Sequence, residues 1–125
     1  MNTVVYREKR TYKKYDSTHI IGYLNETILD KYQPKADDSG TQTEPYTGYQ
    51  YSGPEVDGGT IMPCTDTNSR DDLVNAVIRS KYGESEEFAV QRHHQTDSEA
   101  YADEWTTYTA WCENAKNIVD EWLKA

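Results

Sequence analysis

The sequence predicts an α+β protein, with a small, mostly antiparallel N-terminal sheet followed by a C-terminal three-helix unit that has one long aromatic helix. Three observations support this fold class. Tyr, Thr, Gly and Pro dominate up to about residue 64, and Ala and Glu dominate beyond it. From Asp66 onward the spacing of apolar residues changes from about two to about 3.6, as it does where strands give way to helices. Aromatic residues make up 12% of the chain.

Aromatic side chains must supply much of the core. Leu, Ile, Val and Phe number only 18 of 125 residues and the formal charge is -9, a combination typical of disordered chains. Eleven Tyr and three Trp offset this, because each buries roughly 150–250 Å². We expect a folded domain with an aromatic core. A partner chain is a candidate to complete part of it, since Tyr and Trp suit interfaces.

Short strands are expected in the first part of the chain. Residues 3–6 and 19–24 are β-branched or aromatic, residues 46–51 alternate around Gly48, and residues 60–62 follow a Gly-rich turn. These segments predict a sheet of roughly three to five strands.

Two segments between these strands are not expected to form strands. Asn25 is predicted to cap a brief helical turn over residues 26–29. Residues 34–44 contain one small apolar residue and predict a flexible loop.

Two shorter helices are expected after Asp66. Ser69 is a suitable N-cap for the first, and Gly83 is predicted to end it at the C′ position. Its apolar stripe consists of Leu73, Val74, Val77, Ile78 and Tyr82. Ser85 is predicted to cap the second helix, which fades near His93 and His94.

The third helix is predicted over residues 97–123, with Thr96 and Glu99 in capping-box spacing. Its apolar residues recur at alternating intervals of four and three, as in a heptad seam. The seam consists of Tyr101, Trp105, Tyr108, Cys112, Ala115, Val119 and Trp122, and Trp111 and Ile118 widen it on one flank. The two shorter helices cannot cover a helix about 40 Å long. Either the sheet or another subunit is expected to cover the rest.

The chain is expected to form one compact unit from a β-rich part, residues 1–64, and a helical part, residues 65–125. Charge is unevenly distributed between its ends. Residues 1–35 contain seven Lys or Arg and four Asp or Glu, whereas residues 36–125 contain six and eighteen. The excess of acids disfavours non-specific nucleic-acid binding, which needs a dense cationic surface.

No motif predicts an enzyme, a cofactor or a metal site. The seven glycines form neither a dinucleotide-binding nor a P-loop pattern. His93 and His94 are adjacent, so in a helix they point about 100° apart and cannot share a metal ion. Cys64 and Cys112 are interpreted as unpaired thiols, with a disulfide or a metal pair as the alternative. No membrane span and no secretory signal are expected, because no apolar run is long enough.

The basic segment over residues 7–15 has three possible interpretations. Its cations alternate with tyrosines and are Arg7, Lys9, Arg10, Lys13 and Lys14. They can guard the edge of a solvated hairpin. They can form an arm that docks on an acidic neighbour, including another copy of this chain. They can also track a nucleic-acid backbone while the tyrosines stack on bases.

Three stretches of the sequence resemble a known group of proteins. Residues 48–64 (GYQYSGPEVDGGTIMPC), residues 78–92 (IRSKYGESEEFAVQR) and the aromatic stretch 101–116 resemble short proteins of tailed bacteriophages and prophages of gut Bacteroidetes-type bacteria. The shared pattern covers roughly residues 46–122 and is loosely similar to tail or tail-fibre-associated proteins. The resemblance implies a phage setting and transfers no catalytic residue.

Taken with the seam and the charge distribution, the resemblance implies a non-enzymatic virion structural or assembly protein, such as a tail, fibre, adaptor or capsid-associated subunit. Its expected partners are other phage structural proteins or a second copy, with nucleic acid and membranes disfavoured. Its expected location is the virion, and the host cytoplasm during assembly. Alternatives are an assembly chaperone absent from the virion and a small protein that binds a host target or nucleic acid. The expected interface residues are the five basic residues above together with Tyr101, Trp105, Tyr108, Trp111 and Trp122.

Overall fold

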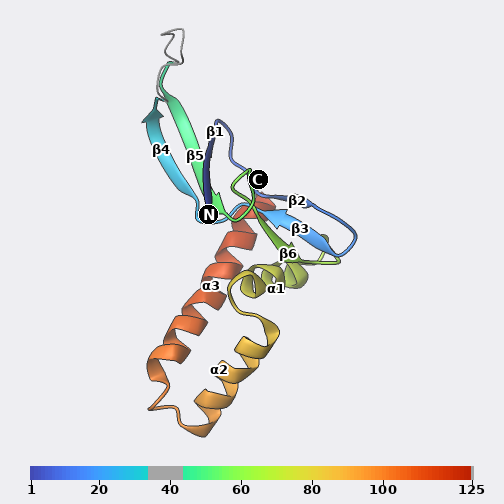
Figure 1. Cartoon of the computed structure of the whole chain (residues 1–125), viewed down its shortest axis with the longest axis vertical. Helices are drawn as coiled ribbons and strands as arrows, with labels where there is room; N and C mark the ends of the chain where they lie inside the picture. The colour runs from blue at the N-terminus through green and yellow to red at the C-terminus, as the bar shows by residue number, and fades with distance from the viewer. Residues whose placement is uncertain (34–43, 125) are drawn as a thin grey trace. The chain divides into compact units, whose positions relative to one another are not determined.

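The computed structural model describes residues 1–33 and 44–124, in which six strands precede three helices (Figure 1). This confirms the predicted α+β class and the long last helix. The loop predicted over residues 34–44 lies, apart from Glu44, outside the described residues. In the described part of the chain, no helix is both long and apolar enough to span a membrane.

The chain divides into two compact units. Unit 1 comprises Met1–Lys13 and Ile21–Thr60, and unit 2 comprises Lys14–Ile20 and Ile61–Ala125. Unit 2 therefore contains residues 14–20 of the strand-rich part of the sequence in addition to the three helices.

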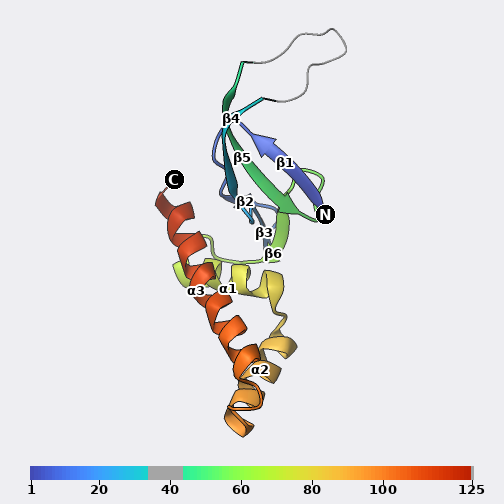
Figure 2. The ribbon, with the colours of Figure 1, turned by 90° about the vertical axis from the view of Figure 1, so that its left-hand side faces the viewer.

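Unit 1 is built on a three-stranded antiparallel sheet. Its central strand is β5 (Tyr46–Gly53), which lies between β1 (Asn2–Tyr6) and β4 (Thr27–Tyr32), as Figures 1 and 2 show. Val4 lies opposite Tyr51, and Ile28 lies opposite Tyr49. The register of β4 shifts between Leu29 and Tyr32.

A second sheet has the strand order β2–β3–β6. These strands are β2 (Tyr12–Lys14), β3 (His19–Gly22) and β6 (Thr60–Pro63). The structure thus has six strands in two sheets, more than the single sheet expected. The added strands are β2, inside the basic segment, and β4.

The helical turn predicted over residues 26–29 is wrong, because these residues belong to strand β4 or lead into it. Asn25 has a φ of 58°, a left-handed conformation that Asn tolerates better than most residues. Its side-chain amide donates to the Ser52 carbonyl at 3.1 Å. Asn25 therefore turns the chain back onto β5 instead of starting a helix.

Gly48 permits close packing within unit 1. A Cβ atom at this position would lie 2.7 Å from Cγ1 of Val5 and 3.3 Å from Cβ of Tyr32. No side chain fits there without displacing a neighbouring residue, so the sheet requires glycine at the middle of the alternating segment.

The three helices of unit 2 are α1 (Arg70–Lys81), α2 (Glu84–Thr96) and α3 (Ala102–Lys124). Ser69 caps α1 as predicted, since its hydroxyl accepts from the Asp72 amide at 3.2 Å. Gly83 follows α1 at the expected place, but its φ of −64° is not left-handed, and it is the N-cap of α2. Ser85 consequently lies inside α2, so its predicted capping role is wrong.

The predicted start of the long helix is also wrong. Thr96 is the last residue of α2, so it cannot cap the next helix, and α3 begins at Ala102. Asp97 provides the turn between them: its amide donates to the His93 carbonyl at 2.9 Å, and its carboxylate accepts from the Ala100 amide at 3.1 Å. The Asp97 carboxylate thus takes the capping role expected of Thr96.

Candidate functional site

The basic segment of unit 1 is held against tyrosine rings. The guanidinium carbon of Arg10 lies 4.0 Å from the centre of the Tyr6 ring and 5.7 Å from that of Tyr23. Arg7 lies 4.0 Å from the centre of the Tyr46 ring. These are distances of cation–π contacts, which orient an arginine without neutralising its charge.

The rings beneath Arg10 form a tyrosine cluster, which we define as Tyr6, Tyr23 and Tyr51. Their ring centres are 5.7 to 6.2 Å apart, with edge-on or tilted geometry. Tyr51 is completely buried and Tyr23 is nearly so. Because one residue follows β3, one ends β1 and one lies in β5, the cluster joins segments that are distant in the sequence.

Each hydroxyl of the tyrosine cluster has an acceptor. The Tyr51 hydroxyl donates to Glu26 at 2.7 Å, the Tyr23 hydroxyl donates to the Asp57 carboxylate at 2.7 Å, and the Tyr6 hydroxyl donates to the Asp57 carbonyl at 2.6 Å. Burial of polar groups costs little when they are paired in this way. The cluster is therefore a satisfied polar network inside an aromatic core.

The pKa values of the tyrosine cluster and of Asp57 agree with a hydrogen-bonded network in which the tyrosines donate and Asp57 accepts. Burial, followed by the hydrogen bond to Asp57, raises the pKa of Tyr23 to about 12. Burial also raises the pKa of Tyr6 and of Tyr51. For Asp57, burial would raise the pKa of the carboxyl, but the hydrogen bonds from Tyr23 and the Gly59 amide outweigh it and the pKa is lowered. At neutral pH the tyrosines are protonated donors and Asp57 is an anion.

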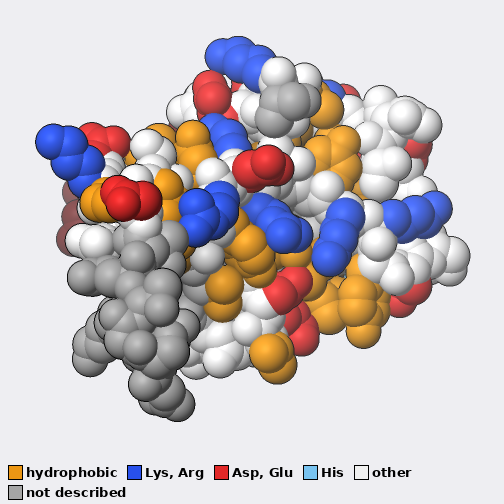
Figure 3. Space-filling model, turned by 90° about the horizontal axis from the view of Figure 1, so that it is seen from above, with side chains coloured by type: hydrophobic (Ala, Val, Ile, Leu, Met, Phe, Trp, Pro, Cys, Tyr) orange, Lys and Arg blue, Asp and Glu red, His pale blue; other side chains and the backbone are white. Residues whose placement is uncertain are grey.

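The backbone of the basic segment is fixed as well. The Arg10 amide donates to the Tyr51 hydroxyl at 2.9 Å, and the Lys9 ammonium lies 3.5 Å from Glu26. Lys13 is exposed in β2 and Lys14, which belongs to unit 2, is exposed too. Figure 3 shows Lys and Arg side chains beside hydrophobic ones on one face of the molecule. Residues 7–10 are thus a docked loop and not a loose arm.

Arg7 and Arg10 retain their positive charge for an outside partner. Neither forms an ion pair with a residue in the ranges 1–33 or 44–124. Both are exposed. A stacked guanidinium keeps its edge available for two parallel hydrogen bonds to a carboxylate or phosphate.

The aromatic residues predicted along the third helix fall into two groups. Tyr108 and Trp122 are only 6% and 5% exposed, so they offer little surface to a partner. Trp105 and Trp111 are half-buried, and Tyr101 is 38% exposed. In unit 2, helices α1 and α2 both pack on α3. Of the five aromatic residues predicted at the interface, only Tyr101, Trp105 and Trp111 have enough exposed side-chain surface to contact a partner.

The turn between α2 and α3 is lined by stacked rings. His93 stacks on Tyr101 with ring centres 4.2 Å apart, and His94 stacks on Trp105 at 3.9 Å. Nδ1 of His93 lies 3.0 Å from Glu104. The adjacent histidines thus have separate partners, which agrees with the expected divergence of their side chains.

One carboxylate connects all three helices. Glu87 in α2 is paired with Arg79 in α1 and accepts a hydrogen bond from the Tyr108 hydroxyl in α3 at 2.5 Å. Burial and this bond raise the pKa of Tyr108. The sequence does not indicate this network, because its members lie on three different helices and no short motif relates them.

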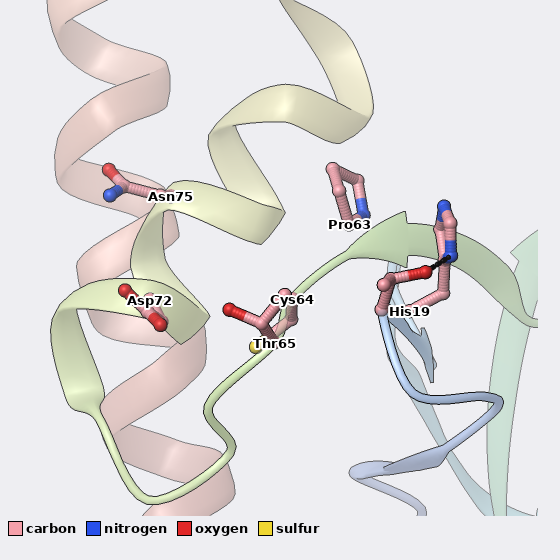
Figure 4. A pocket seen from close by; sticks show the side chains of 7 residues that line it. His19, Pro63, Cys64, Thr65, Asp72 and Asn75 are labelled. Atoms are coloured by element: carbon pink, nitrogen blue, oxygen red, sulfur yellow. Dashed lines mark hydrogen bonds between the residues drawn. The ribbon is translucent and has the colours of Figure 1, made fainter.

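A hollow in unit 2 is lined by seven residues, including Cys64, His19 and Asp72, and has a volume of about 350 Å³ (Figure 4). Cys64 and Cys112 are both free thiols. Burial raises the pKa of the Cys64 thiol, which keeps it protonated and unreactive at neutral pH. Nδ1 of His19 lies 2.8 Å from the Thr18 hydroxyl and 3.1 Å from Asp16. These contacts stabilise the turn after β2, and they do not activate the thiol.

Comparison with protein-family models, curated proteins and solved structures finds no match to this chain.

Proposed function

We propose that this chain is a non-enzymatic assembly component of a phage particle: a tail, fibre, adaptor or capsid-associated subunit that acts through protein–protein contacts. The phage setting rests on the resemblance of residues 48–64, 78–92 and 101–116. The mode of action is supported by the surface of unit 1. Its location would be the virion, after assembly in the host cytoplasm.

One observation carries the proposal: Arg7 and Arg10 are pre-positioned on tyrosine rings without an acidic partner in the described chain. Side chains that are already ordered lose less conformational entropy on binding. Guanidinium groups held in this way suit carboxylates on an opposing surface.

A second copy of the chain is a suitable neighbour. Residues 36–125 contain eighteen acids against six Lys or Arg, so they supply the complementary charge. A contact between unlike surfaces of identical chains is heterologous, and it builds rings or filaments. Other acidic proteins of the particle could occupy the same surface.

The proposal is tested first by mass spectrometry of purified particles. The expected result is a stoichiometric signal for this chain. A chain that is present in infected cells but missing from finished particles would identify an assembly chaperone and contradict the structural role.

The contact is tested by light scattering after size exclusion. At about 100 µM, where contacts with micromolar Kd are populated, we expect oligomers that dissociate as salt is raised. Arg7→Gln with Arg10→Gln should shift the chain to monomer. Arg92→Gln, an exposed cation on α2, is the matched control and should not. Oligomers whose mass changes neither with salt nor with the Arg7 and Arg10 substitutions would refute the docking role of these arginines. Single-stranded DNA binding that the same double variant abolishes would favour the nucleic-acid alternative instead.

A further inference from the structure

A second hollow lies on unit 2, where the last turn of α1 meets one flank of α3. Its volume is about 440 Å³, and it is lined by Lys81, Thr106, Thr107, Ala110, Trp111 and Asn114. Residues 107, 110, 111 and 114 follow the spacing of one helix face. Because Ala110 is small, space is left between the larger side chains above and below it.

One side chain of the hollow, Trp111, has an unused hydrogen-bonding group. The Lys81 ammonium lies 5.0 Å from the centre of its ring. The indole Nε1 is buried and has no hydrogen-bond acceptor in the described chain. A buried donor without an acceptor costs about 1–3 kcal/mol and points to a group that the chain alone does not supply.

Most other polar side chains of the hollow are also unpaired; the exception is Thr107, whose hydroxyl donates to the Asp103 carbonyl at 3.0 Å. Within residues 1–33 and 44–124, Lys81 has no carboxylate partner, and the side chains of Thr106 and Asn114 have no hydrogen bond. No Asp or Glu lines the hollow. This contrasts with the rest of α3, where Lys116 pairs with Glu113 and Arg70 pairs with Asp120. The hollow therefore has several unused donors and one uncompensated positive charge.

From these contacts we infer that the hollow receives the carboxylate of an acidic side chain from a partner protein. The carboxylate pairs with the Lys81 ammonium and accepts from the Thr106 hydroxyl and the Asn114 side-chain amide, which are the unpaired donors at the rim. The methylene groups of a glutamate pack against Ala110 and the indole ring, which favours Glu over a free anion. The inference uses unit 2 alone, so it does not depend on Arg7, Arg10 or the phage setting.

The experiment is a titration of the full chain, followed by the three indole N–H signals in ¹H–¹⁵N NMR spectra. The probe is the peptide acetyl-Ala-Glu-Ala-amide, and the control probe is its Gln counterpart. The expected result is a saturable shift of the Trp111 indole with a millimolar Kd, while the Trp105 and Trp122 indoles stay in place. The Gln peptide should produce no saturable shift.

Two variants locate the binding. Lys81→Gln removes the charge and should weaken the Glu peptide about threefold to fivefold, as expected for a solvent-exposed ion pair. Ala110→Leu fills the hollow from an exposed helical position and should abolish the shift, with circular dichroism confirming the helices. Lys116→Gln is the matched control and should bind as the unaltered chain does.

Three results would overturn the inference. The first is no saturable shift of the Trp111 indole with the Glu peptide. The second is equal binding of both peptides, or binding unaffected by Lys81→Gln and Ala110→Leu. The third is tighter binding of inorganic phosphate than of the Glu peptide, which would show that the hollow is a small-anion site.

Discussion

The backbone amide of Arg10 donates a hydrogen bond to the hydroxyl of Tyr51, 41 positions further along the chain, at 2.9 Å. The same hydroxyl donates to Glu26 at 2.7 Å. One buried oxygen thus fixes the loop before β2 to the central strand of the sheet. The orientation of the basic surface depends on the aromatic core beneath it.

Tyr51→Phe is expected to destabilise the protein by about 1–3 kcal/mol. It removes the donor to Glu26 and the acceptor of the Arg10 amide, and both partners are partly withdrawn from water. Urea unfolding measures the change. Tyr15→Phe is the control, because Tyr15 is 58% exposed and its substitution should leave the midpoint unchanged. Equal midpoints for the two variants would contradict a structural role for the Tyr51 hydroxyl.

The stability of the protein should fall in alkali as the tyrosine cluster ionises. Tyr23 has an ordinary pKa of 10.0, and the folded state raises it to about 12. The folded state therefore holds this proton more tightly. Its stabilising effect is complete below about pH 10 and is lost as the pH rises through 12. The slope of the unfolding free energy against pH between these values should be shallower for Tyr23→Phe than for the unaltered chain. Identical slopes would show that Tyr23 is not responsible.

Gly48→Ala is expected to destabilise unit 1 by about 1–3 kcal/mol, because the new Cβ would overlap Val5. Gly83→Ala is the matched control. A Cβ there meets only Oε1 of Glu86, at 3.5 Å, and its φ of −64° suits alanine. Thermal unfolding compares the two. Similar losses at both positions would argue against the close packing of β5 on its neighbours.

A pair of serine variants tests the helix boundaries. Ser69→Ala should cost about 1 kcal/mol, since it removes the acceptor of the Asp72 amide. Ser85→Ala should be neutral or slightly stabilising, because Ser85 lies inside α2, where alanine is the better helix former. Chemical denaturation decides between this arrangement and the sequence-based expectation that both serines are caps.

The helices were predictable from the sequence to the extent that local signals define them. Ser69 and the apolar stripe of α1 lie within one short segment of the sequence. The seam of α3 lies within another. The boundary between α2 and α3 was less predictable, because Thr96 and Asp97 are adjacent and both can cap. The choice depends on which side chain reaches an unpaired amide, and spacing alone does not reveal it.

The tyrosine cluster was not predictable from local patterns. Tyr6, Tyr23 and Tyr51 lie on separate segments, and their acceptors Glu26 and Asp57 are ordinary surface acids in the sequence. Strand β4 was missed for the same reason, since the left-handed turn at Asn25 is favourable only once β5 is in place to pair with it. The sequence indicates the five basic residues as candidates, but it does not indicate that Arg7 and Arg10 lie on tyrosine rings.

The central position of β5 affects how the chain folds as it leaves the ribosome. In the described sheet of unit 1, β1 and β4 both pair with β5 and not with each other. Neither strand can pair in this sheet until residues 46–53 have been synthesised, so the edge of β1 stays open while residues 7–45 are made. Such pairing between distant segments is slow and exposes a strand to unwanted partners. The cations that follow β1 would reduce that hazard in nascent chains, because like charges keep open edges apart.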